Sequence, residues 1–246
     1  SNDISLLIDG MQTFSTLFSA IDSAKEYILV QFFIVYDDMI GRELKKRLIS
    51  QADAGIRIYF IIDEFGSRKL PKAFIEELQD HGVQILPFNT RRGLWNRFQL
   101  NFRNHRKLVI IDGKRAFAGG LNVGDSYIGQ DPRFTHWRDT HVQFTGPTVT
   151  AAQLCFLEDW YWAARSIPKL HWEPQASETS DKRMLVLPTG PADKLDSCSL
   201  FFTHLINSAE RRIWIVSPYF VPNGEVVVAL QLAALRGVDV RILLPN

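Results

Sequence analysis

A histidine, a lysine and an aspartate stand at fixed spacing in the middle of the chain and suit chemistry on a phosphodiester. His105, Lys107 and Asp112 form the pattern H-x-K-x4-D, and Asn122 follows ten residues after the aspartate. A neutral imidazole can attack phosphorus and form a phosphohistidine, which divides one displacement into two steps. The lysine ammonium can neutralise the non-bridging oxygens, because opposite unit charges about 4 Å apart attract by roughly 4 kcal/mol at an effective dielectric constant near 20.

Two glycines and an asparagine close the motif and are predicted to contact the phosphate. Gly119 and Gly120 would let the backbone approach a phosphate oxygen, because glycine has no side chain. The amide of Asn122 can donate a hydrogen bond to an oxygen of the same group. We therefore assign Lys107, Gly119, Gly120 and Asn122 to phosphate binding.

Two carboxylates are candidates for organising the site. An imidazole nucleophile needs its second nitrogen oriented, commonly by a carboxylate, and Asp139 stands just before a predicted strand. A surface pair of Asp139 with Arg138 is an equally weighted alternative. Asp112 either caps the turn that it begins, as aspartate often does, or organises the site, and we expect no proton transfer from it. The predicted catalytic set is His105, Lys107, Asp112 and Asp139.

An alternating series of helices and strands must position these residues. The apolar run 107–111 predicts a buried strand, and strand alternation would place His105 and Lys107 on one face. Asp112 and Gly113 predict a tight turn into a second strand. The predicted helices are 11–24, 39–54, 71–81 and 147–165, and the predicted strands are 27–35, 56–62, 83–87, 107–111, 116–118 and 141–144. This order indicates an α/β layered fold.

Two local resemblances within the chain suggest an internal repeat. Residues 21–28 resemble residues 206–213, an offset of 185 residues, and both segments end a helix and begin a strand. Residues 54–58 resemble residues 236–240, an offset of 182 residues. Each match is weak alone, but their shared order and nearly constant offset favour duplication.

The repeat predicts two domains of unequal completeness. Residues 1–175 would form one complete repeat that carries the motif, and residues 176–246 would form the beginning of a second repeat that lacks it. The boundary is expected in the polar stretch 173–183. A second His-Lys pair would fall near position 287, beyond Asn246, so the chain would hold half of a two-motif site.

Composition limits the classes of function. Hydrophobic residues make up 46% of the 246 residues and charged residues 22%, which is typical of a globular protein. The net charge of +1 argues against a dedicated nucleic-acid binder, because such proteins carry a strong basic excess. Cys155 and Cys198 form neither a disulfide framework nor a zinc pattern, so no metal is predicted. No apolar run approaches the roughly 20 residues that span a bilayer.

The motif and its flanks resemble the phospholipase D superfamily, and within it the bacterial cardiolipin synthases. Residues 104–114 and 119–125 are similar to that family's first motif, and residues 137–141 resemble its downstream segment. Residues 217–222 and 233–240 resemble the start of its second half. At one position the sequence differs from the broader superfamily: many members have serine where this chain has Gly120.

The resemblance implies a phospholipase D-like layered α-β-α sandwich and a phosphatidyltransferase. His105 would attack phosphatidylglycerol, release glycerol and form a phosphatidyl-histidine, while Lys107 binds phosphate and Asn122 supports it. A second phosphatidylglycerol would then accept the phosphatidyl group and give cardiolipin. The partner histidine would lie beyond Asn246, so this chain alone is expected to be inactive. No metal or organic cofactor is implied, and the protein would work at the bacterial cell membrane, peripherally or through an anchor outside this chain.

Other readings stay open from the sequence. The alternative functions are a phospholipase D-like hydrolase, a nuclease acting on a phosphodiester, and a non-catalytic lipid-binding domain. A homodimer would bring two histidines together, but the partial second repeat argues against that arrangement. A basic and aromatic segment before the motif predicts contact with anionic lipid, or alternatively a loop that folds onto the core. Its candidate residues are Arg91, Arg92, Trp95, Arg97 and Phe98.

Overall fold

The computed structural model describes residues 1–88, 103–132, 136–177, 180–190 and 193–244, and its contacts divide the chain into two units. The units are Ser1–Val186 and Leu187–Asn246. The division falls later than the boundary expected after residue 175. Met184 and Val186 pack against the core of the first unit, and Lys182 forms a β-bridge with Asn2, so the polar stretch belongs to the first unit.

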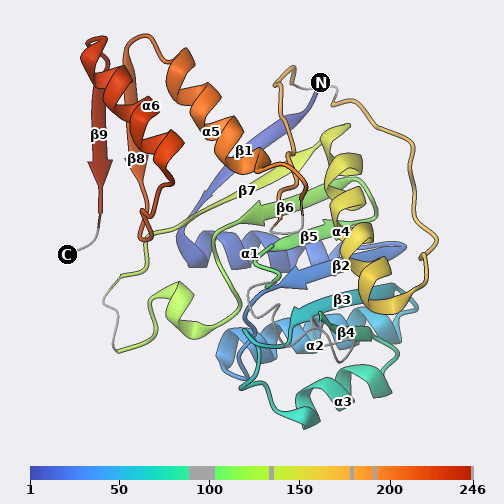
Figure 1. Cartoon of the computed structure of the whole chain (residues 1–246). Coiled ribbons are helices and arrows are strands. Elements are labelled where there is room, and N and C mark those ends of the chain that lie inside the picture. The colour runs from blue at the N-terminus through green and yellow to red at the C-terminus, as the bar shows by residue number, and fades with distance from the viewer. Residues whose placement is uncertain (89–102, 133–135, 178–179, 191–192, 245–246) are drawn as a thin grey trace. The chain divides into compact units, whose positions relative to one another are not determined.

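A seven-stranded mixed sheet forms the centre of the first unit (Figure 1). Its strands are β1 (Asp3–Ile8), β2 (Tyr27–Phe32), β3 (Arg57–Asp63), β4 (Gln84–Phe88), β5 (Leu108–Ile111), β6 (Arg115–Gly119) and β7 (Thr140–Thr145). The order across the sheet is β1-β7-β6-β5-β2-β3-β4. β2, β3 and β4 run parallel, whereas β5 joins β2 antiparallel and continues through β6 and β7 to β1. The motif strand β5 therefore lies at the centre of the sheet.

Helices cover both faces of this sheet, as the predicted layered fold requires. The helical elements of the unit are α1 (Asp9–Asp22), α2 (Met39–Asp53), α3 (Lys72–Asp80), the short 3-10 helix η2 (Asp125–Ile128) and α4 (Thr148–Ala164). The first three helices and η2 pack on the face that carries Val30 and Val109. α4 packs on the opposite face, over Leu29 and Ile110. Neighbouring residues of β2 and β5 thus enter different cores.

Strand β1 has no counterpart among the predicted strands. Of its six residues Leu7 alone is fully buried, so the hydrophobic period that identifies a strand is weak there. β1 is held instead by antiparallel pairing with β7, in which Ile8 faces Thr140. The strands around the motif are predicted well because both of their faces are apolar.

The second unit repeats the first four helix and strand elements that follow β1. It contains α5 (Ser197–Ser208), β8 (Arg212–Val216), α6 (Gly224–Leu235) and β9 (Asp239–Leu243), and β8 pairs with β9 in parallel. The strand register matches the first unit: Arg212 faces Asp239 as Tyr27 faces Arg57. These pairs are related by the offsets of 185 and 182 residues found in the sequence. The shared register supports duplication at the level of backbone pairing.

Candidate active site

The side chains of His105 and Lys107 meet on one phenyl ring. The imidazole of His105 stacks on Phe33, with ring centroids 3.9 Å apart and an interplanar angle of 18°. The Lys107 ammonium lies 5.5 Å from the centroid of the same ring and donates to the His105 carbonyl at 2.6 Å. Both residues precede β5 and share a face, as strand alternation predicts. Phe33 follows β2, the strand beside β5, and was not among the predicted site residues.

Burial and neighbouring charges keep the imidazole neutral near physiological pH. Burial lowers the pKa of His105 below its ordinary value of 6.5, and the charges of Lys107 and Arg103 lower it further, while Asp63 opposes them. Burial also lowers the pKa of Lys107, and the charges of Asp139 and Asp63 oppose that change. A neutral imidazole is the nucleophilic form, so the pair has the electrostatics that attack on phosphorus needs.

Asp63 connects the end of β3 to the start of the motif. Its carboxylate accepts from the backbone N–H groups of Phe65 and Gly66 at 3.0 and 2.8 Å and from that of Asn104 at 2.9 Å. The side chain is 3% exposed. Asp63 therefore fixes the residue before His105 and supplies negative charge near both His105 and Lys107. Its position at the end of a predicted strand is the signal that could have identified it.

Gly119, the first motif glycine, ends β6 and lies beside His141 of β7. Leu108 on β5 pairs with Ala118 on β6, and the next residue of β6, Gly119, pairs with His141 on β7. A Cβ atom on Gly119 would lie 2.4 Å from Nδ1 of His141. His141 thus fills the space that was expected to admit a phosphate oxygen, and the glycine is needed for packing between strands.

His141 is a buried, neutral imidazole that sequence reasoning did not assign. It is 4% exposed, and burial, with a smaller contribution from Lys107, lowers its pKa to about 4. The backbone N–H of Leu121 donates to Nδ1 at 3.4 Å, which fits an unprotonated nitrogen. The sequence feature that could have identified His141 is its position two residues after Asp139.

Asp139 occupies the space beside the second glycine. A Cβ atom on Gly120 would lie 2.2 Å from Oδ1 of Asp139, which explains why a residue larger than glycine does not fit in this arrangement. The carboxylate accepts from the N–H of Thr140 at 2.7 Å and from the indole of Trp137 at 3.4 Å. Its charge acts on Lys107, whereas the acidic charge that raises the pKa of His105 is that of Asp63. Among the described contacts its electrostatic partner is Lys107, and its expected role in orienting His105 stays a prediction.

The amide of Asn122 is engaged inside the protein. Asn122 Oδ1 accepts from the N–H of Ile34 at 3.0 Å, and Nδ2 donates to the hydroxyl of Tyr127 at 3.1 Å. The residue is 7% exposed. These bonds hold the loop that carries Phe33, and the direct phosphate contact expected from the sequence stays a prediction.

Asp112 lies at the opposite end of β5 from Lys107, roughly 16 Å away at the usual strand rise. Its carboxylate accepts three backbone N–H groups, those of Lys25 at 2.8 Å, Glu26 at 2.8 Å and Tyr27 at 2.9 Å. Asp112 and Gly113 both have positive φ, 53° and 66°, as a tight hairpin turn requires. Asp112 thus organises the hairpin and the start of β2 and does not approach His105.

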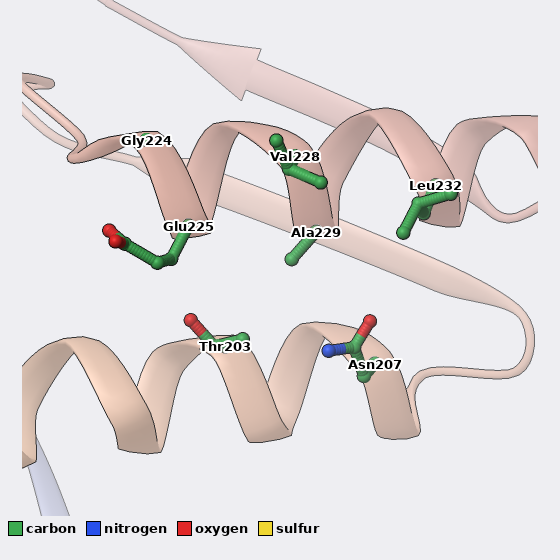
Figure 2. A pocket seen from close by; sticks show the side chains of 7 residues that line it. All are labelled: Thr203, Asn207, Gly224, Glu225, Val228, Ala229 and Leu232. Atoms are coloured by element: carbon green, nitrogen blue, oxygen red, sulfur yellow. The ribbon is translucent and has the colours of Figure 1, made fainter.

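The predicted lipid-contact residues Arg91, Arg92, Trp95, Arg97 and Phe98 lie outside the described residues. A groove of about 420 Å³ lies between α5 and α6 in the second unit (Figure 2). Its lining residues are Thr203, Asn207, Gly224, Glu225, Val228, Ala229 and Leu232. Because none of these is a motif residue, the candidate active site is the one around His105.

A protein-family model matches most of the chain, including the residues around His105 and Lys107. Residues 17–133 and 202–246 match the family model described as "Cardiolipin synthase, PLD-like domain". The chain belongs to this family of phospholipase D-like domains. It is 52% identical over 246 residues to cardiolipin synthase A of Pseudomonas syringae pv. syringae (strain B728a) and 51% identical over 245 residues to that of Pseudomonas putida (strain W619). Each match covers 100% of this chain and 51% of the relative, so the chain spans about half the length of the curated relatives it matches.

Solved structures of low sequence identity share the fold. Phosphatidylserine synthase from Haemophilus influenzae Rd KW20 aligns with a TM-score of 0.70 at 15% identity, over 98% of this chain and 61% of its own. NucT from Helicobacter pylori aligns with a TM-score of 0.53 at 16% identity, over 66% of this chain and 98% of its own. These likenesses confirm the α/β layered fold that the sequence predicted.

Proposed function

We propose that the protein containing this chain is a phosphatidyltransferase of the phospholipase D type that condenses two phosphatidylglycerols to cardiolipin and glycerol. The observation that carries the proposal is the shared face of His105 and Lys107, where a neutral imidazole stands beside an ammonium. The cardiolipin synthase A relatives support the choice of substrate.

The reaction would proceed in two displacements. An imidazole nitrogen of His105 would attack phosphorus, forming a P–N bond while the P–O bond to the glycerol headgroup breaks, and the departing glycerol takes a proton. A hydroxyl of a second phosphatidylglycerol would then attack phosphorus, break the P–N bond and give cardiolipin. Lys107 would neutralise the non-bridging oxygens in both steps. The proton donor and acceptor would be a second histidine supplied after Asn246, so this chain by itself would turn over little or no lipid.

Three carboxylates would act indirectly in this reaction. Asp139 would stabilise the charged form of Lys107, and Asp63 would support both His105 and Lys107 electrostatically. Asp112 would hold the motif hairpin. No resident metal or organic cofactor enters the proposed steps, because the covalent histidine intermediate carries the transferred group.

The substrate places the enzyme at a membrane surface. Phosphatidylglycerol is an anionic lipid, so we propose that the protein works at the bacterial cell membrane, peripherally or through an anchor outside this chain. None of the helices in the described part of the chain combines the length and the apolarity that a membrane span requires. The near-neutral net charge of +1 makes nucleic acid the less favoured phosphodiester.

The test is mass spectrometry of the products formed on phosphatidylglycerol vesicles. This chain would be compared with a chain extended past position 300, together with His105→Ala and, as a control, the exposed His81→Ala variant of the extended chain. Cardiolipin and glycerol from the extended chain, lost in His105→Ala but kept in His81→Ala, would support the proposal. Phosphatidic acid without cardiolipin would show hydrolysis, and an absence of lipid products would favour another phosphodiester or a non-catalytic role.

A further inference from the structure

Asp159 on α4 binds the two residues that alternate with His105 and Lys107. Its Oδ2 atom accepts from Asn104 Nδ2 at 2.8 Å and from Arg106 Nη1 at 2.6 Å. The same oxygen accepts from Nε2 of Gln31 on β2 at 2.7 Å. A single carboxylate oxygen on α4 therefore joins β2 to the segment that carries the motif.

These bonds lie on the face of the sheet opposite the candidate nucleophile. Asn104 and Arg106 reach α4, while His105 and Lys107 reach Phe33 on the other face. The Asp159 side chain is 13% exposed, so its bonds to charged and amide donors are little weakened by water.

The motif segment is fixed further by its own backbone. The N–H of Asn104 donates to Asp63 at 2.9 Å, and the N–H of Arg106 donates to Oδ1 of Asn104 at 3.1 Å. Residues 104–107 precede the regular part of β5, so the β-ladder hydrogen bonds of that strand do not hold them. Their orientation depends instead on side-chain hydrogen bonds. Asp159 accepts two of these bonds, from Asn104 and Arg106.

We propose that Asp159 is a positioning residue for the nucleophile: by holding Asn104 and Arg106 on the α4 face, it makes His105 and Lys107 project together onto Phe33. The catalytic consequence rests on the proposed function, whereas the placement of the two side chains is a property of this chain alone. Rotation of the segment would move the imidazole away from its platform, and a misplacement of about 1 Å can cost roughly 100-fold in rate.

The stacked ring provides a spectroscopic signature for the test. The His105 ring stacks on the face of Phe33, so we expect its proton NMR resonances to be displaced upfield, and His105→Gln would identify them among the six histidines. Asp159→Asn would be compared with Glu158→Gln, which removes the same charge from the neighbouring, exposed position of α4. We expect Asp159→Asn to return the His105 resonances toward those of an exposed histidine and Glu158→Gln to leave them in place.

Unchanged His105 resonances in a folded Asp159→Asn variant would overturn the proposal. If that variant does not fold, Arg106→Met removes one donor from the same oxygen and leaves the carboxylate, and a smaller displacement of the same resonances is then expected. Unchanged resonances in Arg106→Met would equally overturn the proposal.

The rate is a second, separate readout. In the extended chain Asp159→Asn should lower kcat by about 10- to 100-fold with little change in KM, and Glu158→Gln should leave both unchanged. An unchanged kcat in an active enzyme would overturn the catalytic consequence. A wild-type extended chain without lipid turnover would count against the proposed function, and the NMR comparison would still decide the role of Asp159.

Discussion

The imidazole of His105 and the phenyl ring of Phe33 lie nearly parallel, with their centroids 3.9 Å apart, so one face of the imidazole packs on the phenyl ring. Stacking covers a face of the imidazole, whereas the nitrogen lone pair and the N–H bond point outward in the plane of the ring and are not covered by Phe33. Phe33 is itself held, because its carbonyl accepts from Ser67 Oγ at 3.1 Å. The plane in which the nucleophilic lone pair lies is thus defined by the loop after β2.

Replacing Phe33 by leucine should slow phosphatidyl transfer while the fold persists. Leucine fills much of the space but has no flat face, so the imidazole would lose its preferred plane. We expect kcat of the extended chain to fall by about tenfold and the free energy of unfolding by about 1–2 kcal/mol. Phe65→Leu, at a half-exposed ring, is the control, and equal rates in both variants would contradict a platform role for Phe33.

Gly120→Ala should destabilise the first unit through a clash with Asp139. The added Cβ would meet Oδ1 at 2.2 Å, and relief of such overpacking typically costs about 1–3 kcal/mol. Urea unfolding measures the loss, and Gly190→Ala, where a Cβ meets no neighbouring atom, is the control. In an Asp139→Ala background the cost of Gly120→Ala should shrink; an equal cost in both backgrounds would place the clash elsewhere.

Asp139→Asn should change the pH dependence of the reaction with little effect on folding. The negative charge of Asp139 opposes the burial that lowers the pKa of Lys107, so its removal should lower that pKa further. Lys107 would then lose its proton at lower pH, and the basic limb of kcat/KM should move to lower pH. Asp53→Asn, an exposed carboxylate paired with His81, should leave the profile in place. A pH profile of Asp139→Asn that overlays the wild type would remove Asp139 from the site.

His141 should make the first unit less stable in acid. Its pKa is about 4 in the folded chain and about 6.5 when unfolded, so the unfolded state binds a proton that the folded state does not. The stabilisation is complete above pH 6.5 and is lost progressively as the pH falls toward 4, by up to about 3 kcal/mol. His141→Gln should flatten the dependence of the urea midpoint between pH 7 and 4.5, and His204→Gln, at an exposed position of the second unit, is the control. If the urea midpoint of His141→Gln falls with pH as steeply as that of the wild type, the acid sensitivity arises from another group.

Asp112→Ala should cost stability without changing the surroundings of His105. Three backbone N–H groups would lose a charged acceptor, and we expect the free energy of unfolding to fall by about 2–3 kcal/mol. Asp112→Asn should lose less, because asparagine also tolerates positive φ and keeps one acceptor. Circular dichroism with urea measures the change. Altered His105 ring resonances in the folded Asp112→Ala variant would contradict the separation of the two ends of β5.

The sequence predicted the layers and the shared face of His105 and Lys107 because both depend on local periodicity. An apolar strand interior and the alternation of side chains are properties of a few consecutive residues. Strand β1 was missed because its burial comes mainly from pairing with β7, whose partner residues are more than 130 positions away. A single sequence carries no local signal for such pairing.

The supporting residues of the site escaped prediction for a related reason. Asp159 is separated from Arg106 by 53 residues, and Gly119 from His141 by 22, and their contacts exist only after the sheet has formed. The sequence motif drew attention to the two glycines, whose expected contact with phosphate stays a prediction. They accommodate His141 and Asp139, which only the spatial arrangement reveals.

The three bonds of Asp112 have a consequence for how the chain folds. Its partners at Lys25, Glu26 and Tyr27 lie 85 to 87 residues earlier, so this carboxylate closes a long loop. Contacts of such sequence separation form slowly, because the entropy of loop closure is lost before the contact is gained. A peptide spanning only the motif hairpin would therefore lack its anchor, and during synthesis His105 would acquire its surroundings only after β2 was already in place to receive it.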